Sequence, residues 1–143
     1  ALGRLLLLYT IEHGNNWGSF CEIRGAWLRS DLKTAGSKAV YLFMHHPPFN
    51  ISFGDGSYFE YDQPNSLKEF NDLIQNYTQI IGLFCGHIHR TYNTTLGNIA
   101  ASVMPSIALD LSQERISNKV DLPVYHLHKF YDGLRYETEI RHT

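Results

Sequence analysis

The sequence predicts an α/β fold in which a parallel sheet leads into antiparallel hairpins. Short apolar runs alternate with helical patterns from residue 5 to residue 84, as they do in parallel sheets with crossover helices. The rest of the chain holds two pairs of strand-like segments, each pair separated by a turn that contains glycine. No linker-like stretch divides the sequence, so we expect one domain over residues 1–143.

The first unit of this pattern is strand, helix, strand. The leucine run 5–8 predicts a buried strand, and strand 40–43 ends the unit. Between them, Ser19 and Glu22 have the spacing of a capping box, which predicts a helix over residues 19–35. The apolar face of this helix would contain Phe20, Ile23, Trp27, Leu28 and Leu32.

The second unit repeats the alternation. Residues 50–65 are rich in Gly, Asp and Tyr and show no period, so we expect a surface loop there, with a substrate lid as the alternative. A second capping box at Ser66 and Glu69 predicts a helix, and strand 80–84 follows it. The apolar face of this helix would contain Leu67, Phe70, Leu73, Ile74 and Tyr77.

Two hairpins complete the prediction. Strands 91–95 and 99–103 form the first, strands 122–130 and 134–140 form the second, and the polar segment 110–121 would be a loop. The second hairpin carries two histidines that alternate along one strand, and we expect both on the surface of the sheet. These are His126 and His128.

The composition argues against some classes of binding partner. Twelve basic and 14 acidic residues give a formal net charge of −2, which offers no basic field for nucleic acid or for an anionic membrane. No apolar segment approaches the roughly 20 residues that a membrane span needs. Two cysteines do not make a disulfide framework, so we expect a reducing compartment and a cytoplasmic location.

Histidines follow two of the predicted parallel strands. His45 and His46 come after strand 40–43, and His87 and His89 come after strand 80–84. Ligands bind outside the carboxyl ends of such strands, and imidazole is the commonest metal ligand. In an extended segment His87 and His89 would point the same way, and Gly86 would let the backbone approach closely. The pattern predicts a metal site, with hydrogen-bonded core histidines as the alternative.

The paired motifs also carry a resemblance. His45-His46-Pro47-Pro48 and Gly86-His87-Ile88-His89 resemble the motifs of calcineurin-like metallophosphoesterases, most of all the bacterial 3',5'-cyclic-nucleotide phosphodiesterase and glycerophosphodiesterase branch. The resemblance implies a four-layer α/β/β/α sandwich with a dinuclear centre of Fe, Mn, Zn or Co. It also implies hydrolysis of a small phosphomonoester or phosphodiester by water that the metal ions activate.

The same resemblance assigns roles to individual residues. His45 and His87 would ligate one metal ion and His89 the other. His46 would orient its neighbours by hydrogen bonding without binding the metal. Arg90 could contact a substrate phosphate, and a solvated arginine is the equal alternative. The resemblance assigns no residue of this chain as a catalytic acid or base.

The resemblance is to the C-terminal half of such a domain. The family's upstream Asp-x-His and Gly-Asn-His-Asp motifs do not occur in the sequence. We therefore expect strand 5–8 to leave an apolar face uncovered, so that the chain forms a homodimer or belongs to a larger fold. The resemblance leaves the activity of the fragment alone open. Two alternatives are a non-catalytic remnant that serves as a binding or regulatory module, and a structural zinc site.

Overall fold

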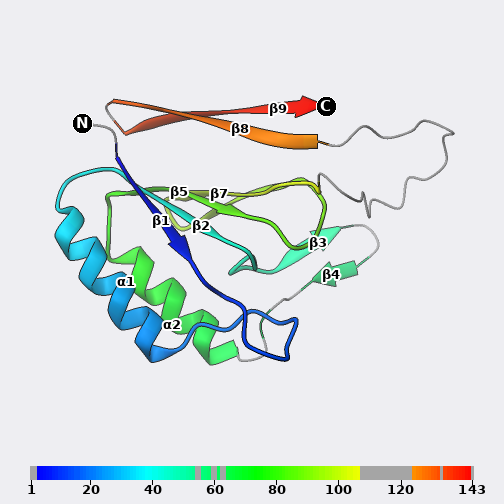
Figure 1. Ribbon diagram of the computed structural model, residues 1–143, viewed down its shortest axis with the longest axis horizontal. Coiled ribbons are helices and arrows are strands. Elements are labelled where there is room, and N and C mark those ends of the chain that lie inside the picture. Colours follow the sequence, from blue (N-terminus) through cyan, green and yellow to red (C-terminus); the bar gives the residue numbers. More distant parts are fainter. Residues whose placement is uncertain are drawn as a thin grey trace, which may run out of the picture.

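The computed structural model describes residues 3–53, 56–58, 61, 64–106, 124–132 and 134–142. In these residues, two helices cover one face of a five-stranded sheet, and a two-stranded hairpin lies over the other face (Figure 1). The predicted α/β class is therefore confirmed. The described residues form layers in the order helices, central sheet and hairpin. The fourth layer that the resemblance implies stays a prediction.

The central sheet places the histidine-bearing strands side by side. Its strands lie in the order β1-β2-β5-β7-β6, and neighbours among the first four are parallel. Strand β6 runs antiparallel to β7, which confirms the first predicted hairpin. The bounds are β1 (Arg4–Leu8), β2 (Val40–Met44), β5 (Ile80–Cys85), β6 (Tyr92–Leu96) and β7 (Ile99–Val103).

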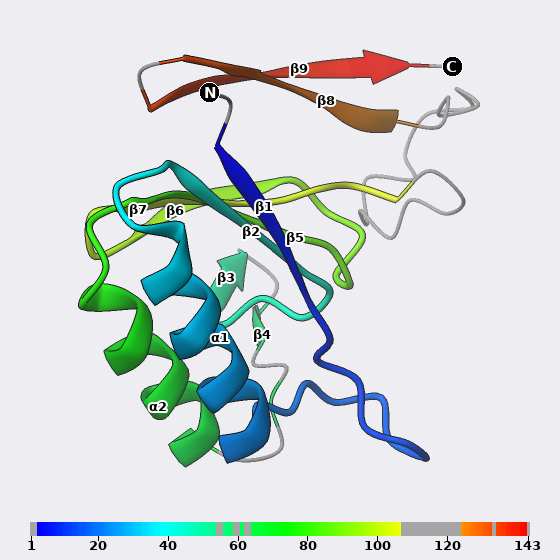
Figure 2. The same cartoon turned by 60° about the vertical axis from the view of Figure 1, so that its left-hand side comes forward.

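Both helices lie on the same face of the sheet, as Figure 2 shows, and both begin at unpredicted residues. Helix α1 (Glu22–Ala35) has Cys21 as its N-cap and no side-chain cap hydrogen bond, so the capping box at Ser19 is wrong. The backbone N–H of Ser19 instead donates to the carbonyl of Thr10 at 2.8 Å. Helix α2 (Pro64–Gln75) starts two residues before Ser66, because proline fits the first turn of a helix.

The two helices differ in how well their apolar faces were predicted. In α2, the buried residues are Leu67, Phe70, Leu73 and Ile74, as expected, whereas Tyr77 lies beyond the end of the helix and is half-buried. In α1, Leu28 and Leu32 are buried, whereas Ile23 is 81% and Trp27 is 47% exposed. Helix α1 also buries Gly25, where an added Cβ would lie 3.5 Å from the Phe20 ring. Helix α1 therefore packs through the face that contains Gly25, and Ile23 and Trp27 are exposed to solvent.

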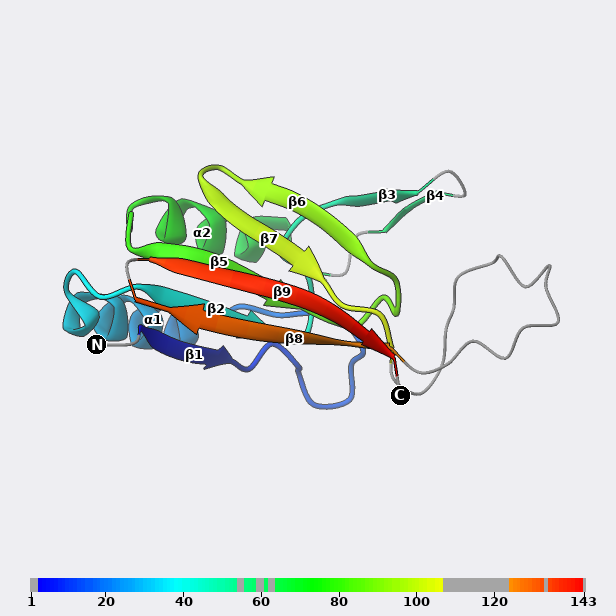
Figure 3. The same ribbon diagram turned by 90° about the horizontal axis from the view of Figure 1, so that it is seen from above.

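Strand β1 forms one edge of the sheet. Leu6 and Leu8 are buried beneath the helices, but Leu5 is 49% and Leu7 is 75% exposed. The prediction of a fully buried strand is wrong, while the expected uncovered apolar face is confirmed. Seen from above, the hairpin lies over β2 and β5 and does not extend across β1 (Figure 3).

The second hairpin consists of β8 (Val124–Tyr131) and β9 (Arg135–His142) and packs on the sheet through aromatic rings. Ring centroids of Tyr41 and Phe130 lie 4.4 Å apart, and those of Phe84 and Tyr136 lie 5.1 Å apart. The ring of His128 packs against that of Phe84 in a tilted arrangement, with centroids 4.2 Å apart. His126 and His128 therefore face the interior, and their predicted place on the sheet surface is wrong.

A short hairpin occupies part of the segment that we expected to be a loop. Strands β3 (Ile51–Phe53) and β4 (Gly56–Tyr58) pair antiparallel, and Ile51 is fully buried. Tyr61 is also buried, which argues against its use in a lid. The predicted loop 110–121 lies outside the described residues. Neither described helix is long and apolar enough to cross a membrane.

Two glycines of this sheet differ in how much room they leave. A Cβ on Gly82 would lie 2.9 Å from Cζ of Phe84 and 3.2 Å from Cε1 of Tyr136, whereas one on Gly86 would lie 3.7 Å from Nδ1 of His45. Only Gly82 is therefore needed for space, and the expected need for glycine at Gly86 is wrong.

Gly82→Ala is expected to displace the Phe84 ring and lower the free energy of unfolding by about 1–3 kcal/mol, measured by urea denaturation. Gly86→Ala is the matched control and should change it by less than about 0.5 kcal/mol. Equal losses in the two variants would contradict this account of how the β8–β9 hairpin packs on the sheet.

Candidate metal centre

The two histidine motifs meet at one edge of the sheet. His45 directly follows β2, and His87 follows the adjacent parallel strand β5 by two residues. The backbone N–H of Gly86 donates to the carbonyl of His45 at 3.0 Å, so a main-chain hydrogen bond joins the motifs. The distance between them is thereby set by backbone as well as by side chains.

Three imidazoles cluster at this edge. Nδ1 of His87 lies 3.1 Å from Nε2 of His45. One ring nitrogen each of His45, His46 and His87 forms a group whose members all lie within 4.8 Å of one another. His89 lies outside this group. The structure thus brings together two of the three predicted ligands and adds His46, which was predicted only to support them.

His46 already uses both of its ring nitrogens. Its Nε2 lies 3.0 Å from the carbonyl of Asn16, and since a carbonyl can only accept, this nitrogen carries the proton. Its Nδ1 then accepts from the hydroxyl of Thr10 at 2.8 Å. The side chain is 1% exposed, and the hydroxyl of Tyr61 donates to its backbone carbonyl at 3.2 Å. This arrangement suits an orienting residue better than a ligand.

Sequence reasoning missed the residues that hold His46. Thr10 follows strand β1, and Asn16 lies in the turn after it, so both are far from His46 in sequence. No spacing pattern signals a contact between a hydroxyl and an imidazole 36 residues apart. A hydroxyl directly after a parallel strand, at the edge where His45 and His46 also lie, is the available signal.

Loss of hydration favours the neutral form of two of these imidazoles, those of buried His46 and of exposed His45. Loss of hydration lowers the pKa of His46 to about 4, although the Asn16 carbonyl opposes the shift by accepting from the ring. Loss of hydration and the neighbouring imidazoles of His87 and His89 lower the pKa of His45. His45 and His46 are therefore neutral at neutral pH. The neutral ring of His45 offers a lone pair to a metal ion, whereas the lone pair of His46 already accepts from the Thr10 hydroxyl.

The segment that carries His87 and His89 is a tight turn. Their φ angles are 73° and 56°, in the left-handed region, so the prediction of an extended segment is wrong. Buried Ile88 lies between them and donates its N–H to the carbonyl of Gly86 at 2.9 Å. A non-glycine residue held in this region costs about 1–3 kcal/mol, and such residues concentrate at functional sites.

These residues fit a metal ion on three independent observations. Two imidazole nitrogens bound to one tetrahedral zinc at about 2.0–2.1 Å would lie about 3.3 Å apart, close to the 3.1 Å between His45 and His87. Nδ1 of His89 is buried and has no hydrogen-bond partner in the described part of the chain. The backbone strain at His87 and His89 is typical of a binding site. Arg90 is half-buried beside His89, and its contact with substrate stays a prediction.

Comparison with known proteins finds phosphodiesterases among the relatives of this chain. No family model matches the sequence. A protein of Arcobacter nitrofigilis named "Probable glycerophosphodiester phosphodiesterase" is 34% identical over 120 residues, which cover 78% of this chain and 41% of that protein. A glycerophosphodiester phosphodiesterase of Enterobacter lignolyticus is 26% identical over 103 residues, covering 72% of the chain and 36% of the relative.

A third relative is a 3',5'-cyclic-nucleotide phosphodiesterase of a Nostoc species, 23% identical over 116 residues, which cover 80% of the chain and 42% of the relative. The chain thus spans about two fifths of the length of these curated relatives. Their names match the branch that the paired histidine motifs predicted. The resemblance is therefore confirmed: this chain is a relative, over part of their length, of the bacterial glycerophosphodiester and 3',5'-cyclic-nucleotide phosphodiesterases.

Proposed function

We propose that the chain forms part of a metal-dependent phosphoesterase that hydrolyses a phosphodiester or a phosphomonoester. The 3.1 Å approach of the His45 and His87 ring nitrogens carries this proposal, because it sets two imidazoles at the carboxyl edge of a parallel sheet, where ligands bind. The names of the three relatives supply the reaction class.

The positions of the three histidines suggest which metal ion each of them would bind. His45 and His87 would hold one ion, and the buried Nδ1 of His89 would face a second. Iron, manganese, zinc and cobalt all accept imidazole. The clustered group contains only histidines among the described residues, so any carboxylate ligand would come from outside the described part of the chain.

When bound, a metal pair supplies Lewis acidity at the phosphoryl group and lowers the pKa of water. The chain's own residues do the positioning. His46 donates to the Asn16 carbonyl and fixes the turn next to His45, and Ile88 anchors the turn between His87 and His89. Arg90 would donate to phosphoryl oxygens, for which a guanidinium fork is well shaped. Together these residues would hold a small phosphoester at the sheet edge.

His87→Ala in the intact protein tests the proposal. The variant is expected to lose at least one bound metal ion per chain, measured by elemental analysis. It should also lose most of its hydrolysis of bis(p-nitrophenyl) phosphate, because a catalytic metal needs each of its few protein ligands. His13→Ala, at an exposed histidine, is the matched control and should change neither.

Two other results would decide against the enzyme. If His87→Ala left metal content and turnover unchanged, the site assignment would be wrong. If the intact wild-type protein bound metal through His87 but hydrolysed neither mono- nor diesters, it would be a binding module or a structural zinc site instead.

A further inference from the structure

The two peptide groups that follow His45 are both held by hydrogen bonds. The carbonyl of His45 accepts from the N–H of Gly86 at 3.0 Å. The N–H of His46 donates to the Thr10 hydroxyl oxygen at 3.4 Å, and the carbonyl of His46 accepts from the hydroxyl of Tyr61 at 3.2 Å. These contacts come from three separate segments, and together they fix the direction in which the chain leaves strand β2.

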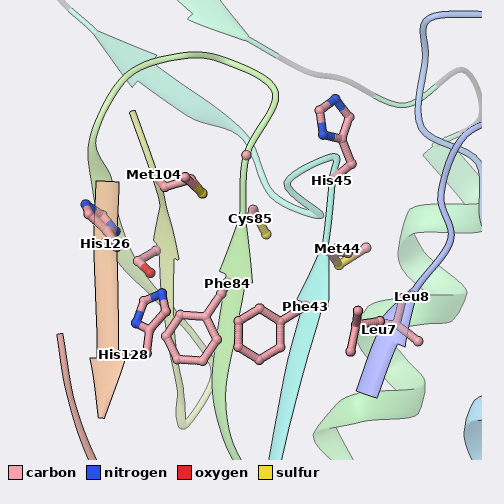
Figure 4. A pocket seen from close by; sticks show the side chains of 12 residues that line it. Leu7, Leu8, Phe43, Met44, His45, Phe84, Cys85, Met104, His126 and His128 are labelled. Atoms are coloured by element: carbon pink, nitrogen blue, oxygen red, sulfur yellow. The ribbon is translucent and has the colours of Figure 1, made fainter. Parts of the chain in front are cut away.

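Tyr61 reaches this peptide from inside the protein. It is 4% exposed, and its ring lies edge-on to that of His46, with centroids 6.3 Å apart. Loss of hydration and, to a smaller extent, the neighbouring thiol of Cys85 raise the pKa of Tyr61, so its hydroxyl stays protonated and donates. Figure 4 shows Cys85 at the end of β5 and His45 just beyond the end of the neighbouring β2. Tyr61 therefore lies close to the edge where the two histidine motifs meet.

The backbone of Tyr61 is joined to the same turn that holds the ring of His46. Gly18 forms a parallel bridge with Tyr61 and an antiparallel bridge with Ile11. Asn16, whose carbonyl accepts from Nε2 of His46 at 3.0 Å, lies two residues before Gly18. These contacts form a closed loop, which leaves His46 through its ring and returns to its carbonyl through the hydroxyl of Tyr61. A side chain held at both ends in this way keeps its neighbours in one arrangement.

A packing role alone does not account for a tyrosine at this position. Phenylalanine would fill the same volume without burying a hydroxyl, whose burial costs free energy unless it is hydrogen-bonded. The hydroxyl of Tyr61 donates to the main chain of the residue that directly follows a predicted ligand. Groups that orient metal ligands from outside the coordination shell commonly change metal affinity when they are removed.

We propose that Tyr61 is a positioning residue of the candidate metal centre, whose hydroxyl holds the peptide after His45 so that the His45 ring keeps its 3.1 Å approach to His87 before any metal binds. The inference rests on the proposed function, because this position of His45 matters for binding only if His45 is a metal ligand. Ligands that are ordered in advance bind more tightly, since less conformational freedom is lost on binding. Tyr61 thus supports the metal centre from within and does not close over it as a lid.

Tyr61→Phe in the intact protein tests this role, because it removes the hydroxyl and keeps the ring. The affinity for Zn²⁺, measured by competition with a chelator, is expected to fall about three- to tenfold, the effect of one hydrogen bond. Raising the Zn²⁺ concentration should restore full occupancy in Tyr61→Phe. It should not do so in His87→Ala, which removes a ligand.

Tyr41 offers a closely matched control. It is also buried, and its hydroxyl donates to a backbone carbonyl, that of Arg135, at 3.3 Å. It lies in β2 four residues before His45, which is about 13 Å along a strand. Tyr41→Phe should therefore lower the urea midpoint of the metal-free protein much as Tyr61→Phe does. Its Zn²⁺ affinity should stay within about twofold of the wild-type value.

The ring signals of His45 in the metal-free protein give a measurement that needs neither metal nor turnover. NMR of the histidine-labelled intact protein should show these signals displaced in Tyr61→Phe and unchanged in Tyr41→Phe. Wild-type Zn²⁺ affinity together with undisplaced His45 signals in Tyr61→Phe would overturn the role of Tyr61 and leave the metal centre standing. Failure of the wild-type protein to bind metal would instead overturn the proposed function, and with it the task assigned to Tyr61.

Discussion

His46→Leu in the intact protein is expected to weaken metal binding about 10- to 100-fold, although His46 is not proposed to touch the metal. The buried ring bridges the Thr10 hydroxyl and the Asn16 carbonyl, and these contacts hold the chain directly after His45. Leucine fills the space but leaves the Asn16 carbonyl without its imidazole donor and the Thr10 hydroxyl without an acceptor for its proton. The free energy of unfolding should therefore also fall, by about 1–3 kcal/mol.

Separate measurements distinguish the two effects of His46→Leu. Metal affinity is measured by competition with a chelator, and stability by urea denaturation of the metal-free protein. Thr10→Val removes one of the two ring contacts and should lie between wild type and His46→Leu in both. If metal affinity stayed at the wild-type value while stability fell, His46 would be a packing residue only.

Leu28→Ala is expected to cost about 2–5 kcal/mol of unfolding free energy, the usual range for a buried leucine. Leu28 is fully buried on the sheet-facing side of α1. Trp27→Ala is the matched control at the preceding position, where the larger side chain is 47% exposed. That change should cost less than about 1 kcal/mol, because much of the ring already contacts water.

Urea denaturation of the intact protein gives both values. Equal losses, or a larger loss for Trp27→Ala, would mean that α1 lies on the sheet through the face that the sequence pattern indicated. Leu28→Ala should leave metal affinity unchanged in whatever fraction of the protein stays folded. It therefore also serves as the purely structural control for His46→Leu.

The elements with a strong local signal were predictable. Strands β2 and β5 are short apolar runs, and the β6–β7 hairpin turns at Gly97, whose φ of 60° suits glycine. Helix α2 has four regularly spaced apolar residues, and all four are buried. In each case the information lies within the segment itself, so no distant contact is needed to place it.

Features that depend on distant partners were not predictable. The buried face of α1 is set by how Gly25 approaches the Phe20 ring, which no periodicity records. Leu5 and Leu7 look like core residues, and only the absence of a covering layer over β1 among the described residues exposes them. The inward orientation of His126 likewise follows from the packing of the hairpin on Tyr41 and Phe84.

The candidate site was predictable in its residue types and not in its backbone. Two histidine motifs after parallel strands suffice to predict that His45 and His87 converge. The left-handed turn at His87 and His89 follows from the burial of Ile88 and from its hydrogen bond to Gly86. A rule based on alternation along a strand has no means of anticipating such a turn.

In the turn that carries His87 and His89, folding stability favours glycine, whereas metal binding needs histidine. Glycine is the residue for which positive φ is easiest, so a chain optimised for thermal endurance alone would drift toward glycine at His87 and His89. Each such replacement would erase an imidazole. Histidine at both positions therefore costs folding stability that glycine would spare, and in return it places two imidazoles at this edge of the sheet.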